Sequence, residues 1–163
     1  MADELSDAEK ARKDLLWGMY TDLRAHSRHA ETLRANVVNF TVVIASALVA
    51  VIINDGRVGR SDLALCVVIV ITGLSGLAFA ASYTELHERN RLRAMRIREA
   101  LDVEFFANAP ATISGLLNEA DAPHEASSLF RHSRGLIGST QRFWLFVPLF
   151  AVLAGVLLGV VAL

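Results

Sequence analysis

The sequence predicts an all-α integral membrane protein with three transmembrane helices. Of its 163 residues 53% are hydrophobic, and the mean hydropathy is +0.41. The apolar residues gather in three stretches without Lys, Arg, Asp or Glu, at 37–53, 63–82 and 143–163. About 20 apolar residues cross a hydrocarbon core of roughly 30 Å, so the last two stretches are long enough and the first is near the lower limit. A soluble chain of this length could not bury three such helices.

Four segments follow from this pattern. Residues 1–35 are expected to form a cytoplasmic amphipathic helix, 36–82 a transmembrane hairpin, 83–142 a helical cytoplasmic segment, and 143–163 the third span. Ser6 and Glu9 have the spacing of a capping box that starts a helix. Since no proline precedes Pro110, this helix is expected to continue into the first span. Prolines and glycines divide the middle segment, where we expect short helices at 112–120 and 123–137.

The orientation follows from the basic residues. Fourteen of the 16 Lys and Arg residues lie before Asn36 or between Thr84 and Arg142. Because Lys and Arg near the ends of spans stay on the cytoplasmic side, we expect the N-terminus and the middle segment in the cytoplasm and the C-terminus outside. The net charge of −1 gives no argument for nucleic-acid binding.

Both predicted cytoplasmic helices carry an apolar seam at three- and four-residue spacing. The short turn after residue 53 brings the two helices together as an antiparallel pair, within one chain or between chains. His26 and Asn90 interrupt the seams with polar groups. The first seam comprises Leu16, Met19, Leu23, His26, Ala30, Leu33 and Val37, and the second Tyr83, Leu86, Asn90, Ala94, Ile97, Leu101 and Phe105.

Small residues recur every four positions in the second and third spans. Such a face lets two helix backbones approach closely in a membrane. It could serve packing within one chain or contact between subunits, and the sequence leaves both open. The residues are Thr72, Gly76 and Ala80, and Ala151, Gly155 and Gly159.

Two sets of polar residues near the expected spans suggest contacts with lipid or solute. A run of arginines follows the second span, and it is either a solvated helix surface or a site for anionic lipid head groups or a nucleotide. Asn36 and Asn39 lie at the inner end of the first span, where they either hydrogen-bond neighbouring helices or ring a pore mouth. The arginines are Arg89, Arg91, Arg93, Arg96 and Arg98.

No set of residues has the spacing of a catalytic, cofactor or metal site. Asp22, His26 and His29 share a helix face but lack a third strong ligand. Cys66 is a lone cysteine inside the second span, where it fits a small packing residue. We therefore expect no enzyme, with His124 and His132 as the nearest approach to catalytic groups, and we expect no cofactor.

The layout of residues 15–20, the two-span hairpin and Tyr83-Thr84-Glu85-Leu86 before the basic helix resembles small bacterial membrane proteins of the SLATT family. These are two-span effectors of nucleotide-signalled defence systems, suspected of forming pores. The third span departs from that pattern and is similar to the three-span octameric membrane proteins of the RipA type. The resemblance implies a homo-oligomer of the bacterial inner membrane and carries over no functional residue.

These observations lead to one functional expectation and one alternative. We expect a homo-oligomeric inner-membrane protein, a pore-forming or membrane-perturbing effector controlled by its cytoplasmic helices. The alternative is a non-conducting anchor or scaffold that docks a soluble protein on its cytoplasmic segment. The lipid bilayer is a partner in both cases.

Overall fold

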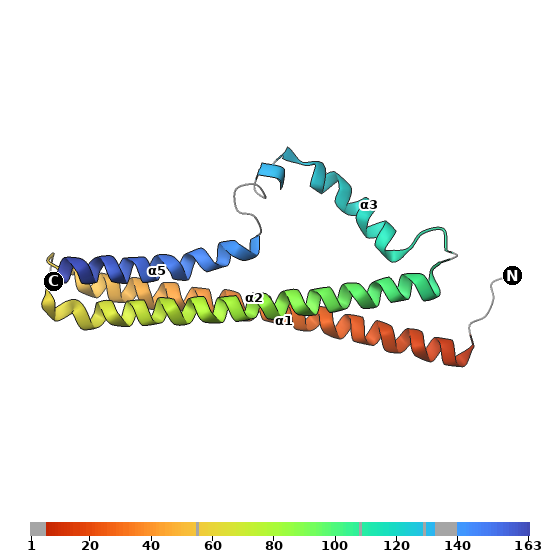
Figure 1. Ribbon diagram of the computed structural model, residues 1–163, viewed down its shortest axis with the longest axis horizontal. Helices are drawn as coiled ribbons and strands as arrows, with labels where there is room; N and C mark the ends of the chain where they lie inside the picture. The colour runs from red at the N-terminus through yellow and green to blue at the C-terminus, as the bar shows by residue number, and fades with distance from the viewer. Residues whose placement is uncertain (1–5, 55, 108, 129, 133–139) are drawn as a thin grey trace. The chain divides into compact units, whose positions relative to one another are not determined.

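The computed structural model describes residues 6–54, 56–107, 109–128, 130–132 and 140–163, and no strand occurs among them. Its helices are α1 (Asp7–Ile53), the short 3-10 helix η1 (Arg60–Asp62), α2 (Leu63–Phe105), α3 (Ile113–Ala126) and α5 (Thr140–Ala162) (Figure 1). α1, the segment of η1 with α2, and α5 are each long and apolar enough to cross a membrane. The predicted all-helical fold with three candidate spans is therefore confirmed.

The chain forms two compact units. The apolar unit comprises Ala30–Glu85 and Ile137–Leu163, and the charged unit comprises Met1–His29 and Leu86–Leu136. α1 and α2 each run through both units, with one part of the helix in the charged unit and the other part in the apolar unit. The expected continuity of the N-terminal helix with the first span is confirmed, because α1 is one helix of 47 residues.

α1 begins at the predicted capping box. The backbone N–H of Ser6 donates to Glu9 Oε2 at 2.8 Å, and the Glu9 N–H donates to Ser6 Oγ at 3.3 Å. These two bonds satisfy donors that the first turn of a helix leaves without partners. The hydrogen bonds from Ser6 hold the pKa of the Glu9 carboxyl below its usual value.

The turn between α1 and α2 depends on one glycine. Gly56 has a φ of +69°, a conformation that residues with a Cβ adopt at a cost, and its N–H donates to the Ile53 carbonyl. Asp62 Oδ2 then accepts the Gly59 N–H at 2.9 Å at the start of η1. This short connection lets the first two candidate spans run antiparallel within the apolar unit (Figure 1).

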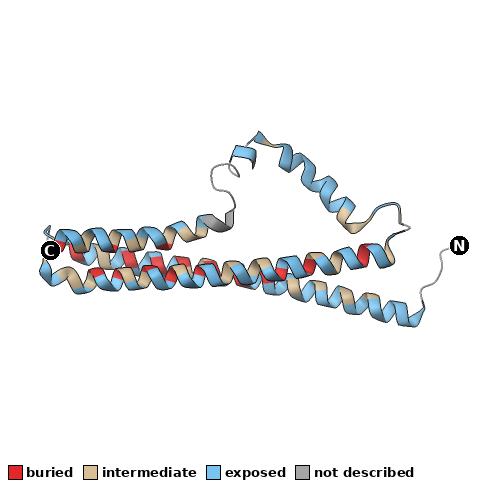
Figure 2. Cartoon of the chain, in the orientation of Figure 1, coloured by how far each residue is buried: buried red, intermediate tan, exposed pale blue. Residues whose placement is uncertain are grey.

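The core of the apolar unit draws on all three long helices. Ala45 and Ile52 of α1 cluster with Cys66 and Ile69 of α2, and Leu158 of α5 packs against them. Buried residues lie along the faces by which α1, α2 and α5 meet (Figure 2). The outward faces of these helices are exposed and largely apolar.

In the charged unit, α1 and α2 pair within one chain. Arg12 forms an ion pair with Glu104, and the Lys13 ammonium lies 5.4 Å from the centre of the Phe106 ring. α3 follows α2 and continues through Pro123 to Ala126, so the expected break between residues 120 and 123 is wrong. The proline stands close to the C-terminal end of α3, where the helix bond that it removes is one of the last. The later part of the helix expected at 123–137 lies largely outside the described residues.

Candidate functional site

The buried face of α1 in the apolar unit carries polar as well as apolar side chains. Arg34 and Thr41 are 5% and 4% exposed and alternate along the helix with alanine, valine and isoleucine. An eleven-residue spacing relates Ala30, Thr41 and Ile52, and it also relates Arg34 to Ala45. Eleven residues make three turns at 3.67 residues per turn, close to the 3.6 of an α-helix, so the seam needs no left-handed supercoil.

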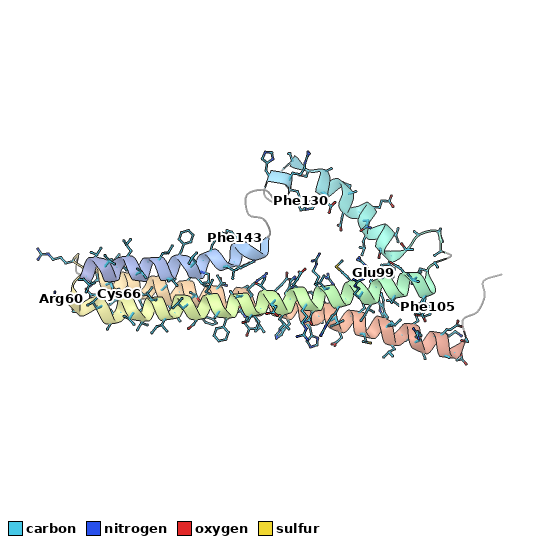
Figure 3. All side chains as sticks on the ribbon, viewed as in Figure 1. Arg60, Cys66, Glu99, Phe105, Phe130 and Phe143 are labelled. Carbon is cyan, nitrogen blue, oxygen red and sulfur yellow. The ribbon has the colours of Figure 1, made fainter. Side chains whose placement is uncertain are left out.

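Glycines bring the three helices of the apolar unit into backbone contact. A Cβ on Gly76 of α2 would overlap the Thr41 side chain of α1. A Cβ on Gly155 of α5 would lie 2.8 Å from Val70 Cγ2 and 3.1 Å from the Cys66 carbonyl oxygen. Cys66 lies towards the Arg60 end of this unit, far along α5 from Phe143 (Figure 3). In hydrocarbon, such close approach is how helices associate.

The predicted small-residue faces therefore lie largely inside the chain. Gly76, Ala80 and Gly155 are buried, whereas Thr72, Ala151 and Gly159 are half-buried. A further residue, Gly73, was not among the predicted residues: a Cβ there would lie 2.8 Å from the Val152 backbone nitrogen of α5. The sequence signal for Gly73 is a second glycine three residues before Gly76 on the same helix. The two glycines contact different helices, Gly73 contacting α5 and Gly76 contacting α1.

An arginine joins all three helices at one end of the apolar unit. Arg34 of α1 donates from Nη1 to Thr84 Oγ1 of α2 at 3.2 Å, and its Cζ lies 5.4 Å from the Trp144 ring centre of α5. The buried Nε has no hydrogen-bond partner, and the charge of Glu31, one turn earlier on α1, also acts on the guanidinium. The cation is thus held by an aromatic face and a hydroxyl group, which ties α5 to the other two helices.

The outward faces of α1 and α5 differ in chemistry. Asn36, Asn39 and Ser46 of α1 are exposed. Among the described side chains, neither asparagine makes a hydrogen bond, and the Ser46 hydroxyl donates to the Val43 carbonyl of its own helix. The exposed face of α5 is made of large apolar side chains, namely Phe146, Leu149, Phe150, Leu153, Val156, Leu157, Val160 and Val161.

The charged unit contains a buried polar contact between its two long helices. Ser27 is 2% exposed, and its Oγ lies 2.9 Å from Nδ1 of His87 in a hydrogen bond. Of the predicted seam residues, Ala30, Asn90, Ala94 and Leu101 are buried. Leu16, Leu23, Leu33 and Ile97 are half-buried, while Met19, His26 and Leu86 are exposed. On α1 the buried position is Ser27 rather than the adjacent His26.

The arginines after the second span do not converge on one site. Arg91 and Arg96 pair with Glu88 and Glu99 on their own helix, at 3.0 and 3.1 Å. Arg89, Arg91, Arg93 and Arg96 are exposed, and Arg98 is half-buried. These side chains present positive charge to solvent along several directions of α2.

A carboxylate on α2 holds the start of α3, a role that sequence reasoning missed. Asp102 Oδ1 accepts the Ile113 N–H at 2.7 Å, and Oδ2 accepts the Ser114 N–H at 2.9 Å. Thr112 Oγ1 accepts the next N–H, that of Gly115. Burial by itself would raise the pKa of Asp102, but the hydrogen bonds from Ser114 and Ile113 and the nearby Arg98 charge hold it below its usual value. In the sequence, Asp102 could not be distinguished from a solvent-exposed acidic residue, because the N–H groups that it binds belong to another helix, α3.

α3 leaves its apolar side chains uncovered. None of its residues is buried, and Leu116 and Leu117 are 56% and 40% exposed. Three acidic residues, Glu119, Asp121 and Glu125, are also exposed on this helix. α3 is thus an acidic helix with free leucines, attached to α2 through its N-terminus.

The described residues contain no group of three His, Cys, Asp or Glu side chains that could hold a metal ion. Nδ1 of His26 contacts the Asp22 carbonyl of its own helix at 2.9 Å. The His124 and Phe130 rings are tilted by 59° to each other, with ring centres 4.7 Å apart. These contacts tie the histidines to local neighbours.

Compared with protein-family models, with curated proteins and with solved structures, the chain shows no match.

Proposed function

We propose that this is a homo-oligomeric, multi-pass protein of a bacterial inner membrane, not an enzyme, and that it forms a pore or perturbs the membrane under control of its charged unit. The N-terminus and the charged unit lie in the cytoplasm, and the C-terminus lies outside. The distribution of lysine and arginine supports this orientation. The three candidate spans support the membrane location.

The observation that carries the proposal is the uncovered apolar surface of the charged unit. Leu15 is 64% exposed, Val103 76% and Leu116 56%, in a part of the chain that is otherwise rich in charge. Large apolar side chains left uncovered on α1, α2 and α3 of one unit favour association in water where they form a common surface. A second copy fits this surface, because the acidic residues of α3 complement the exposed arginines of α2.

The packing of the apolar unit constrains where a path for solutes could run. At Gly73, Gly76 and Gly155 the helices meet so closely that one added carbon atom would overlap a neighbour. The interior of one chain therefore leaves little room for a path. In this proposal the path lies between copies, so membrane activity depends on assembly.

The test replaces both exposed leucines of α3 by serine, as Leu116→Ser with Leu117→Ser. Ala120→Ser is the control, because Ala120 is exposed on the same helix and is already small. We expect the double variant to shift towards the monomer mass in lipid nanodiscs and to lose dye release from liposomes, while the control keeps both. A double variant that keeps the parent's mass contradicts assembly through this surface.

A second candidate is a non-conducting anchor that docks a soluble protein on the charged unit. It is favoured by the glycine contacts, which place Gly76 and Gly155 of the predicted small residues against neighbours within one chain. Dye release from liposomes separates the two candidates, because an anchor leaves the vesicles sealed. Protein that remains a monomer and releases no dye would favour the anchor.

A further inference from the structure

One face of α1 in the apolar unit is directed away from the other two helices. Positions 36, 39, 43, 46 and 50 follow each other at three- and four-residue spacing, which places them on one stripe of a helix with 3.6 residues per turn. All five are exposed. They lie opposite the buried seam that contains Arg34, Thr41 and Ala45. We call Asn36, Asn39, Val43, Ser46 and Ala50 the α1 stripe.

The α1 stripe is unlike a surface made for lipid. α5 exposes a continuous series of phenylalanine, leucine and valine side chains, which suits contact with acyl chains. On α1, large side chains such as Phe40, Ile44 and Val51 are also exposed, but they flank the stripe. The stripe itself combines two carboxamides and a hydroxyl group with one alanine and one valine, Val43, which is 63% exposed.

The carboxamides identify the occupant. Asn39 lies inside the uncharged stretch at 37–53 and Asn36 directly before it, and an amide without a hydrogen-bond partner is costly where it meets hydrocarbon, because a lipid tail offers none. Asn36 and Asn39 each carry both donors and acceptors, so an identical stripe on another copy can satisfy them reciprocally. Ser46 and Ala50 allow the two backbones to come close enough for these bonds.

We propose that two copies of this protein contact each other in the membrane through the α1 stripe, with Asn36 and Asn39 hydrogen-bonding across the contact. The inference rests on the proposed homo-oligomer and names its interface within the membrane. The contact that we propose joins two parallel copies about a two-fold axis, and near such an axis equal positions of the stripe face each other. α5 then faces lipid.

Cysteine crosslinking in native membranes tests the interface. Single substitutions Ser46→Cys and Ala50→Cys place thiols on the stripe, and Ile44→Cys and Val51→Cys place them on exposed flanks of the same helix. Leu153→Cys does so on α5. The native Cys66 is 2% exposed, so the unmodified protein serves as the baseline. Disulfides form only where Cα atoms come within about 7 Å, so oxidation reports direct contact.

We expect several-fold more disulfide-linked dimer for the two stripe positions than for the two flanking positions and Leu153→Cys. Asn39→Leu, added to Ser46→Cys, should reduce the crosslink. Dimer that forms through Leu153→Cys instead, or through the flanks equally, overturns the α1 interface but leaves the homo-oligomer standing. An oligomeric mass without a crosslink at either stripe position would likewise overturn the α1 interface and leave the homo-oligomer standing. A monomeric mass together with no crosslink at any position overturns both proposals.

Discussion

Gly76 of α2 lies directly against the side chain of Thr41 of α1, with no room for a Cβ between them. The Thr41 hydroxyl donates to the Val37 carbonyl of its own helix at 2.9 Å, so a polar residue is accommodated inside an apolar unit without losing its hydrogen bond. The pair marks a point of close contact between α1 and α2.

Substitution of this glycine tests the contact. Gly76→Ala is expected to destabilise the fold by about 1–3 kcal/mol, because an added methyl group forces tightly packed helices apart. Gly18→Ala on the exposed part of α1, where nothing lies within 4 Å, is expected to stabilise by about 0.5–1 kcal/mol through helix propensity. Gly159→Ala, with its nearest neighbour at 3.7 Å, should be tolerated. Thermal unfolding in lipid measures all three variants.

Arg34 and Trp144 are expected to be energetically coupled. Their contact places a guanidinium over an indole, an interaction of about 0.5–2 kcal/mol. A double-mutant cycle with Arg34→Gln and Trp144→Leu measures this coupling through the free energy of unfolding. Trp17→Leu replaces Trp144→Leu in the control cycle, because Trp17 lies in the charged unit and is 51% exposed. Additive effects in the main cycle would argue against the contact.

The start of α3 should depend on pH through Asp102. Its pKa is lower in the folded state than in the unfolded chain, so its hydrogen bonds stabilise α3 above the ordinary aspartate pKa of about 3.9. This stabilisation is lost as the pH falls through the lower folded-state value. We expect α3 to lose protection from hydrogen exchange under strongly acidic conditions, after correction for the intrinsic exchange rate.

Asp102→Asn should lower the protection of α3 at neutral pH and remove most of its acid sensitivity, because an amide accepts these bonds less strongly than a carboxylate. Asp121→Asn is the control, since Asp121 is exposed on α3 itself. Equal behaviour of the two variants would show that Asp102 does not hold this helix.

The proposed orientation makes a separate prediction for impermeant thiol reagents. In spheroplasts, whose inner membrane is intact, Leu163→Cys should react with the reagent from outside. Lys10→Cys should react only after the membrane is permeabilised. Cys66 is buried and gives little background. The opposite labelling pattern would invert the topology and place the charged unit outside.

The spans and the long first helix could be predicted because uncharged apolar stretches and capping residues are local signals. The buried face of α1 could be predicted only in part, since Ala30 of the predicted seam is buried. Apolar spacing selects Leu33 and Val37, while the structure buries Arg34 and Val38 beside them. In a unit whose outer surface is apolar, hydrophobicity no longer separates inside from outside, and polar side chains such as Thr41 can turn inward.

The same limit applies to the site. Small residues every four positions indicate close packing but not the partner, so Gly76 and Gly155 could not be assigned to contacts within or between chains. Gly73 and Asp102 owe their roles to neighbours on other elements, Val152 on α5 and Ile113 on α3. Such pairings depend on tertiary structure rather than on local pattern.

The mass of the unmodified protein in lipid nanodiscs, determined by native mass spectrometry, tests the central claim most directly. A single defined multiple of the 17.7 kDa chain is the predicted result, because the uncovered leucines of the charged unit and the asparagines of α1 each call for a second copy. A mass of one chain over a range of protein concentrations would contradict the homo-oligomer.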